Sequence, residues 1–249
     1  MDKNTSKLPF DPSRWPFFYG WFILAAGTVG VLFSVPGQTI GVSAFTEPLM
    51  DALELERTTL SFAYMVGTGC SALLLTFAGK FYDRFGARVT AICSGLGLGG
   101  VLLMLSQIDH ISTALAGWAG FAGSSVFIAA VMSVGFLLLR FSGQGVMTMT
   151  SSNMVMKWFD RHRGLASGIM NAFIPIGFSM APPIFHGMIE SVGWSRTWLY
   201  IGAATGLAFT VFAAVFFRDN PEDCGLYPDG NPDHDPDCPD VGPEKDFTL

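Results

Sequence analysis

The stretch Gly79-Lys-Phe-Tyr-Asp83-Arg84-Phe-Gly86-Ala-Arg88 joins two long apolar runs of the chain. Its two glycines permit a tight turn between packed helices. Asp83 can cap the start of a helix or face the N-terminus of a neighbouring helix. Arg84 and Arg88 can pair with carboxylates or lipid phosphates. An ordinary basic loop would explain the two arginines but not the whole spacing.

The composition around this stretch indicates an integral membrane protein. Of the 249 residues, 50% are hydrophobic and only 14% are charged, whereas soluble domains carry about 25% charged residues. The net charge of −6 arises from residues 219–249, which hold ten acidic residues and one lysine. The remainder is net basic without the clustering that nucleic-acid binding requires, and the four cysteines form no disulfide framework.

The polar breaks divide the chain into six segments long enough to cross a bilayer, which takes roughly 20 apolar residues each. We expect a break at Pro36-Gly37 in the first segment, because proline interrupts helical hydrogen bonding. The expected helices cover about 18–46, 58–79, 88–107, 126–157, 164–189 and 196–217.

Arg140 leaves two interpretations of the fourth segment open. Either 111–139 crosses the membrane and 141–156 lies on its surface, or 111–125 is an outer loop and the helix runs from about Val126 to Met156. We favour the second, because 141–156 has too little charge for a surface helix. In that helix Arg140, Gln144, Thr148 and Ser151 would share one face.

The basic residues predict the orientation of the segments, because lysine and arginine concentrate on the cytoplasmic side. One set of connections contains most of them, and the opposite set contains only Arg57 and Arg196. Both termini are therefore expected to be cytoplasmic, with the chain in the plasma or inner membrane. The basic set comprises Lys3, Lys7, Arg14, Lys80, Arg84, Arg88, Lys157, Arg161, Arg163 and Arg218.

The spacing of the 79–88 stretch resembles the signature loop of the major facilitator superfamily, G-x-x-x-D-R-x-G-x-[RK]. Gly79, Asp83, Arg84, Gly86 and Arg88 fall on its positions, and an alanine follows Gly86 where a basic residue is common. The resemblance implies one half of that fold, a six-helix bundle of two inverted three-helix repeats. It also implies that the loop is a cytoplasmic latch that stabilises one access state.

Other stretches resemble the branch that holds monocarboxylate transporters and oxalate–formate antiporters. They lie at 18–21, 140–145, 157–164 and 218–230. Within the third we expect the latch to include Lys157, Asp160, Arg161 and Arg163. A lysine found midway along the first helix in several animal carriers is absent, since that region reads Val35-Pro-Gly-Gln-Thr39, and this departure weakens a carboxylate assignment.

Arg140 is the strongest candidate for the substrate pathway. A cation inside a membrane is costly unless it is paired or hydrated, so it usually faces a cavity. No Asp or Glu lies within any of the six expected segments, and a carboxylate substrate could pair with it bidentately. The alternative is a structural arginine that helix-end carbonyls or water satisfy.

Five other polar residues are placed on the expected pathway: Gln38, Tyr64, Gln144, Asn171 and His186. Each is alternatively explained by hydrogen bonding between helices, which is common for polar residues in membranes. A lone histidine can titrate near neutral pH but is weak evidence for proton coupling.

No sequence feature supports an enzyme, a cofactor or a metal site. Residues 95–100 match G-x-G-x-x-G, but a dinucleotide site needs a preceding strand and a following helix start, and this stretch lies inside an apolar helix. Cys224, His234 and Cys238 fit no standard zinc spacing.

We therefore expect three regions: a cytoplasmic arm at 1–17, a six-helix transmembrane bundle at 18–217, and an acidic, proline-rich cytoplasmic linker at 218–249 that is disordered. The expected function is half of a secondary transporter for a small organic solute, with a carboxylate anion favoured. Its partners would be the bilayer and a missing six-helix half or a second copy, because residues 244–249 resemble a linker leading onward. The alternatives are a non-transporting interaction protein, a half-transporter subunit, or a carrier of neutral solutes or drugs.

Overall fold

The computed structural model describes residues 12, 17–121 and 124–230, and in these it contains helices but no strand. Four helices are long and apolar enough to cross a membrane: Arg57–Leu105, Ser125–Trp158, Arg163–Val192 and Trp194–Phe216. A shorter apolar helix covers Gly20–Phe33. The all-α class is confirmed for this part of the chain, while the count of six crossings stays a prediction.

The first helical region is broken where the sequence predicted. Helix α1 covers Gly20–Phe33, a 3₁₀ turn covers Val35–Gly37, and α2 (Thr39–Ser43) and α3 (Thr46–Leu53) follow. Pro36 cannot donate a backbone hydrogen bond and its ring conflicts with the preceding turn. Gln38 is accordingly extended, with φ −86° and ψ 158°.

Helix α4 (Arg57–Leu105) consists of two helical segments that meet at Gly86, whose φ is 80° and ψ 177°. The first segment is longer than predicted, because the helix continues through the signature stretch as far as Phe85. The expectation that both glycines form the turn is wrong. Gly79 lies inside the helix, and a Cβ added there would meet nothing within 4 Å, so Gly86 alone makes the turn.

A single helical run over Ser125–Trp158 confirms the favoured interpretation of the fourth segment. It comprises α6 (Ser125–Arg140), a π-helical segment (Phe141–Met147) and α7 (Thr148–Trp158). The alternative with a surface helix at 141–156 is therefore wrong. The preceding region is not a plain loop, since α5 covers Ile108–Trp118.

The last part of the described chain holds α8 (Arg163–Val192), which contains three prolines, and then α9 (Trp194–Ala203). A second π-helical segment (Ala204–Phe209) joins α9 to α10 (Thr210–Phe216). Two 3₁₀ turns follow, at Glu222–Cys224 and Pro228–Gly230. Most of the expected arm at 1–17 and residues 231–249 of the expected linker lie outside the described residues.

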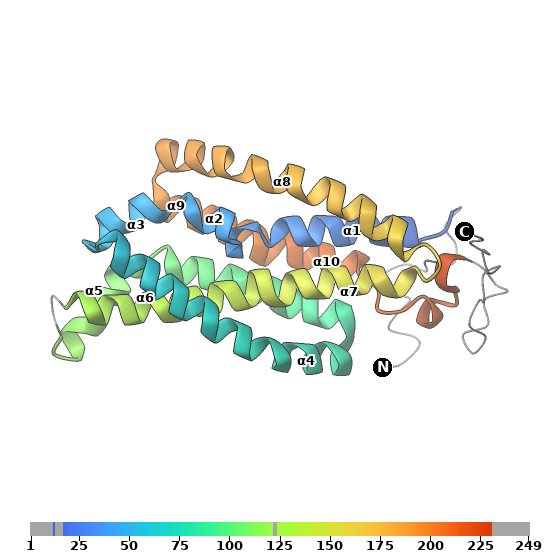
Figure 1. Ribbon diagram of the computed structural model, residues 1–249, viewed down its shortest axis with the longest axis horizontal. Coiled ribbons are helices and arrows are strands. Elements are labelled where there is room, and N and C mark those ends of the chain that lie inside the picture. The colour runs from blue at the N-terminus through green and yellow to red at the C-terminus, as the bar shows by residue number, and fades with distance from the viewer. Residues whose placement is uncertain (1–11, 13–16, 122–123, 231–249) are drawn as a thin grey trace, which may run out of the picture.

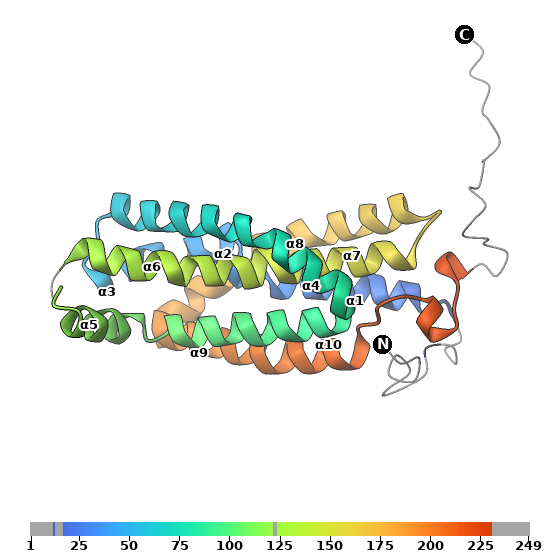
Figure 2. The ribbon, with the colours of Figure 1, turned by 90° about the horizontal axis from the view of Figure 1, so that it is seen from below.

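The long helices run side by side along one axis, which gives an elongated bundle (Figures 1 and 2). Helix α4 contacts α6, the first π-helical segment, α9 and α10, and α1 packs against α7 and α8. The start of α1, the turn in α4, the α7–α8 turn and residues 218–230 lie at one end of the bundle (Figure 1). We call it the Gly86 end. The opposite end, which carries α3, α5 and the α8–α9 turn, is the Trp118 end.

Candidate functional site

Two irregular backbone segments meet inside the bundle, the break after α1 and the π-helical segment after α6. Gly37 and Gly143 form the contact, because a Cβ added to either one would lie 2.8 Å from the Cα of the other. The absence of side chains therefore lets the two backbones touch. π-Helical segments occur frequently at functional sites, and buried polar groups gather around this contact.

Arg140 is the last residue of α6 and lies beside this contact with only 8% of its surface exposed. Its Nη1 donates to Thr39 Oγ1 at 3.0 Å and to the Gly37 carbonyl at 3.5 Å. The guanidinium carbon lies 5.4 Å from the centroid of the Tyr64 ring, within the range of a cation–π contact. Tyr64 also donates to Thr39 Oγ1, at 3.0 Å.

Among the described residues, the Nε and Nη2 side of the guanidinium has no hydrogen-bond partner. Arg140 Nε is buried without a hydrogen bond, and among the described residues Nη2 donates none and no carboxylate pairs with the group. The N–H groups of Nε and Nη2 point the same way from one edge of a planar guanidinium, and this geometry matches the two oxygens of a carboxylate. These two donors, which the described protein does not satisfy, have the geometry to bind an anion.

A second polar cluster, centred on Gln38, lies next to the polar groups around Arg140. Its Nε2 donates to Ser34 Oγ at 2.9 Å and to Thr148 Oγ1 at 3.1 Å. The Thr148 hydroxyl in turn donates to Ser34 Oγ at 3.0 Å. These bonds connect the break after α1 to the start of α7, so Gln38 stabilises the contact between these two segments.

A cavity of about 180 Å³ adjoins Thr39 and Tyr64, the two neighbours of Arg140. Hydroxyl groups from α2, α3 and α4 line it together with apolar side chains. The lining residues are Thr39, Val42, Ser43, Thr46, Leu49, Leu60, Ser61, Tyr64 and Phe136. Its size and hydroxyls suit a small polar molecule close to the cation.

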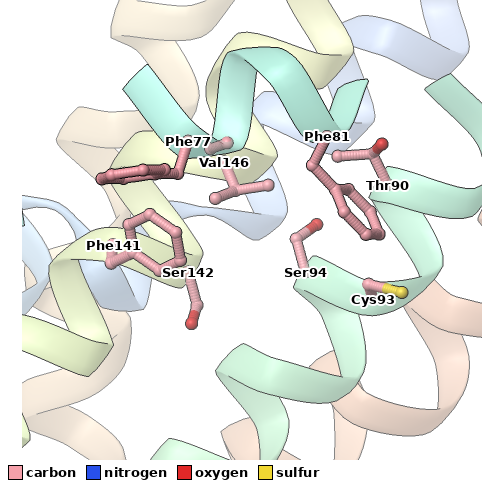
Figure 3. Close-up of a pocket in the computed structure, with 9 residues that line it drawn as sticks. Phe77, Phe81, Thr90, Cys93, Ser94, Phe141, Ser142 and Val146 are labelled. Carbon is pink, nitrogen blue, oxygen red and sulfur yellow. The ribbon is translucent and has the colours of Figure 1, made fainter. Parts of the chain in front are cut away.

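A larger cavity of about 320 Å³ lies between the two segments of α4 and the first π-helical segment (Figure 3). Figure 3 shows aromatic rings of Phe77, Phe81 and Phe141 around it, with Cys93 and Ser94 on the other segment of α4. Its lining contains no charged group. It therefore lacks the chemistry to recognise an ion.

The structure brings together only some of the predicted pathway residues. Arg140, Gln38 and Tyr64 surround the helix break, whereas Gln144, Asn171 and His186 are exposed and make no hydrogen bond among the described residues. Gln144 departs from the predicted common face of Arg140, Gln144, Thr148 and Ser151, whereas Arg140 and Ser151 are buried and Thr148 is half-buried. A π-helical turn holds more residues than an α-helical turn, so Arg140 is buried while Gln144 points outward.

The turn at Gly86 divides the signature stretch into two parts. Asp83 and Arg84 are exposed, and Asp83 forms no hydrogen bond or ion pair within the described chain. Arg88 instead faces its own bundle, where its guanidinium donates to the carbonyl of Ala214. The backbone N–H of Arg88 donates to Asp219 Oδ1 at 2.9 Å.

Comparison with known families agrees with this geometry. The sequence model of the Major Facilitator Superfamily matches residues 27–226, which includes the helix break, the Gly86 turn and every long helix. The chain belongs to the major facilitator superfamily. Members of this superfamily are multi-pass membrane transporters of the cell membrane, and the resemblance predicted from the signature stretch is confirmed.

The chain is similar to several curated transporters of the superfamily. It is 24% identical over 184 residues to a probable sulfoacetate transporter, SauU, of Cupriavidus necator, which covers 74% of this chain and 38% of that protein. It is 24% identical over 195 residues to the oxalate:formate antiporter of Oxalobacter formigenes, covering 78% and 42%. An uncharacterised transporter of Escherichia coli, YhjX, is 26% identical over 202 residues, covering 81% and 45%.

The chain thus spans about two fifths of the length of the curated relatives it matches. No solved structure matches the chain.

The α7–α8 turn carries the remaining predicted latch residues. Arg163 pairs with Asp160 at 3.1 Å between Nη2 and Oδ1, and its Nε donates to the Phe159 carbonyl at 2.9 Å. Lys157 Nζ lies 4.9 Å from the centroid of the Tyr82 ring on α4. These contacts stabilise the basic α7–α8 turn within its own bundle.

Three residues that organise these sites were not predicted. Thr39 is the shared acceptor beside Arg140, and Asp219 and Asp229 hold the two turns at the Gly86 end. Helical periodicity could not reveal them, because each acts across the bundle. The only available signal was the branch-like stretch at 218–230, which contains both acids.

Proposed function

We propose that this chain forms one six-helix bundle of a secondary transporter that carries a small carboxylate anion by alternating access. In the superfamily fold two such bundles rock around a site near the middle of the membrane. The second bundle would be a further six-helix unit or a second copy of this one. The other bundle would close the side of the site that Arg140 leaves open.

The helix breaks support the proposal of six crossings. The first is α1 with its continuation through α2 and α3, and the two segments of α4 on either side of Gly86 are the second and third. Ser125–Trp158 is the fourth, α8 the fifth, and α9 with α10 the sixth. The Gly86 end carries most of the basic residues, so we place it, with both termini, in the cytoplasm.

The buried Nε of Arg140, which has no hydrogen-bond partner among the described residues, is the observation that carries the choice of an anion. A buried cation is costly, and among the described residues only Nη1 of this guanidinium makes hydrogen bonds. A carboxylate bound at Nε and Nη2 would satisfy the buried Nε and neutralise the charge. The names of two relatives, a probable sulfoacetate transporter and an oxalate:formate antiporter, agree with a small anionic substrate.

The substitution Arg140→Lys tests the proposal in proteoliposomes that contain the transporter of which this chain is one bundle. Lysine keeps the charge but cannot present two parallel N–H groups. Charge-assisted hydrogen bonds contribute about 1.5–3 kcal/mol, so we expect uptake of labelled formate, acetate or oxalate to fall by about 10- to 100-fold. The matched control is Arg57→Lys, at an exposed arginine that pairs with Glu47 at the Trp118 end.

Unchanged carboxylate uptake in Arg140→Lys would refute the proposal. Transport of a neutral solute by both the native protein and this variant would instead support the alternative, in which Arg140 only holds the helix break through Gly37 and Thr39.

A further inference from the structure

The segment Arg218–Gly230, which follows α10, packs against the Gly86 end of the bundle (Figure 2). Its composition is acidic and rich in proline, and we expected all of 218–249 to be a solvated linker. The described part nevertheless contributes Cys224, which is 1% exposed, to the hydrophobic core, and Leu226 packs against that core. Trp158 also donates from Nε1 to the Arg218 carbonyl at 3.4 Å.

Asp219 binds the start of the second segment of α4. Its carboxylate accepts from the backbone N–H of Arg88 at 2.9 Å and from that of Ala87. The first N–H groups of a helix have no partner within the helix, so Asp219 supplies a cap from far along the chain. A Cβ on Gly86 would lie 2.5 Å from this carboxylate, and only glycine leaves room for the cap.

Asp229 binds the α7–α8 turn in the same way. Its Oδ2 accepts from the backbone N–H of Asp160 at 3.0 Å and of Arg161 at 2.6 Å, and Oδ1 lies 3.1 Å from His162 Nδ1. The Asp229 side chain is only 8% exposed. Its φ of 57° is in the left-handed region, which aspartate and asparagine tolerate better than most residues.

We propose that Arg218–Gly230 is a clasp that couples the Gly86 turn to the α7–α8 turn, with Asp219 and Asp229 as its positioning residues. The two anchors lie in one short segment whose middle is fixed in the core by Cys224. Lys157, in the last helical turn of α7, also reaches the Tyr82 ring beside the Gly86 turn. A rocking bundle needs such connections if its turns are to move as one body.

The functional role of the clasp rests on the proposed transport function. The coupling between the two turns, however, can be tested without measuring transport. Amide hydrogen exchange of the protein in lipid nanodiscs reports the N–H groups of Ala87, Arg88, Asp160 and Arg161 directly. Asp229→Asn removes the charge while keeping a residue that tolerates the left-handed conformation. We expect it to raise exchange at 160–161 at least tenfold and at 87–88 at least threefold.

Asp219→Ala, which removes both acceptor oxygens, should produce the reciprocal pattern, with the larger rise at 87–88. The matched control is Glu222→Gln, which neutralises an exposed carboxylate of the same segment that accepts no hydrogen bond from the described residues. If each variant raised exchange only at its own turn, the two aspartates would be independent caps and the clasp would be refuted. Asp229→Gly provides a second variant that keeps the backbone conformation and removes the acceptor entirely.

A second experiment on the same variants measures the maximal rate and the KM of carboxylate transport in proteoliposomes. A positioning role predicts that Asp219→Ala and Asp229→Asn lower the maximal rate at least fivefold and leave KM within about twofold. A raised KM with an unchanged maximal rate would contradict that role. If the native protein transported no carboxylate, the proposed function would fail, and hydrogen exchange would still decide whether the two turns are coupled.

Discussion

The surroundings of Arg140 and the Gly86 end of the bundle are built from similar parts but are completed differently. Each combines interrupted helices, a glycine in close contact and buried polar groups. At the Gly86 end, Asp219 and Asp229 accept hydrogen bonds from backbone N–H groups of the two turns. Around Arg140, by contrast, Nε is buried without a hydrogen-bond partner among the described residues.

The difference separates a structural site from a candidate binding site. Buried polar groups normally have hydrogen-bond partners, and an unpartnered one carries a free-energy cost. At the Gly86 end the protein supplies acceptors for the backbone N–H groups of both turns, which stabilises one conformation, although the buried Tyr82 hydroxyl has no hydrogen-bond partner among the described residues. Where the protein leaves a directed pair of donors open, a ligand can supply the acceptors.

The largest expected effect comes from Gly86→Ala, which tests how completely the Gly86 end is filled. A side chain at φ 80° is strained, and the new Cβ would collide with the Asp219 carboxylate. We expect the free energy of unfolding to fall by about 2–4 kcal/mol, measured by denaturation in detergent. The control Gly79→Ala, in the same stretch but with open space around it, should be neutral or stabilising; equal losses in both variants would contradict this account.

A smaller effect is expected from Thr39→Val, which sharpens the account of the Arg140 region. Valine matches the shape of threonine but removes the oxygen that accepts from both Arg140 and Tyr64. Of these two hydrogen bonds, only the one from Arg140 orients the cation; its loss corresponds to about 1 kcal/mol, so substrate affinity in a binding assay should fall about fivefold.

The companion variant of that experiment is Tyr64→Phe. It keeps the ring beside the guanidinium and removes only the hydroxyl, so affinity should change by about twofold or less. A larger loss in Tyr64→Phe than in Thr39→Val would show that the tyrosine hydroxyl, rather than Thr39, positions the cation.

The smallest effect concerns pH and contrasts the two aspartates of the clasp. Burial raises the pKa of Asp219 in spite of its backbone hydrogen bonds. Burial also acts to raise the pKa of Asp229, but hydrogen bonds from Arg161, Asp160 and His162 outweigh it and lower that pKa. Asp229 therefore stabilises the fold above the ordinary carboxyl pKa of about 4, and this contribution is lost as pH falls through its lowered value.

The contribution of Asp219 to stability changes with pH in the opposite direction, because its charged form is disfavoured in the fold. Acidification through its raised pKa therefore increases that contribution. A ¹³C NMR titration of labelled aspartate carboxyls should show Asp219 protonating at higher pH than Asp229. The reverse order would contradict the assignment of Asp229 as the better-bonded carboxylate.

Much of the fold could be predicted because its signals are local. The break at Pro36-Gly37 follows from the chemistry of proline, and the helix through Arg140 follows from the scarcity of charge in 141–156. The helical face of Gln144 could not be predicted, because the π-helical segment shifts the register. The pathway assignments of Asn171 and His186 remain predictions, and both residues lie on exposed surface of α8.

The sequence by itself determined that this chain is a helical membrane protein of the major facilitator superfamily, since composition, apolar segment length and the 79–88 spacing are properties of the chain alone. The tertiary structure decided which donors of Arg140 are bonded, why Gly86 rather than Gly79 is required, and that Asp219 caps a helix 131 positions away. These outcomes depend on contacts between distant segments, and packing, not periodicity, determines which distant groups meet.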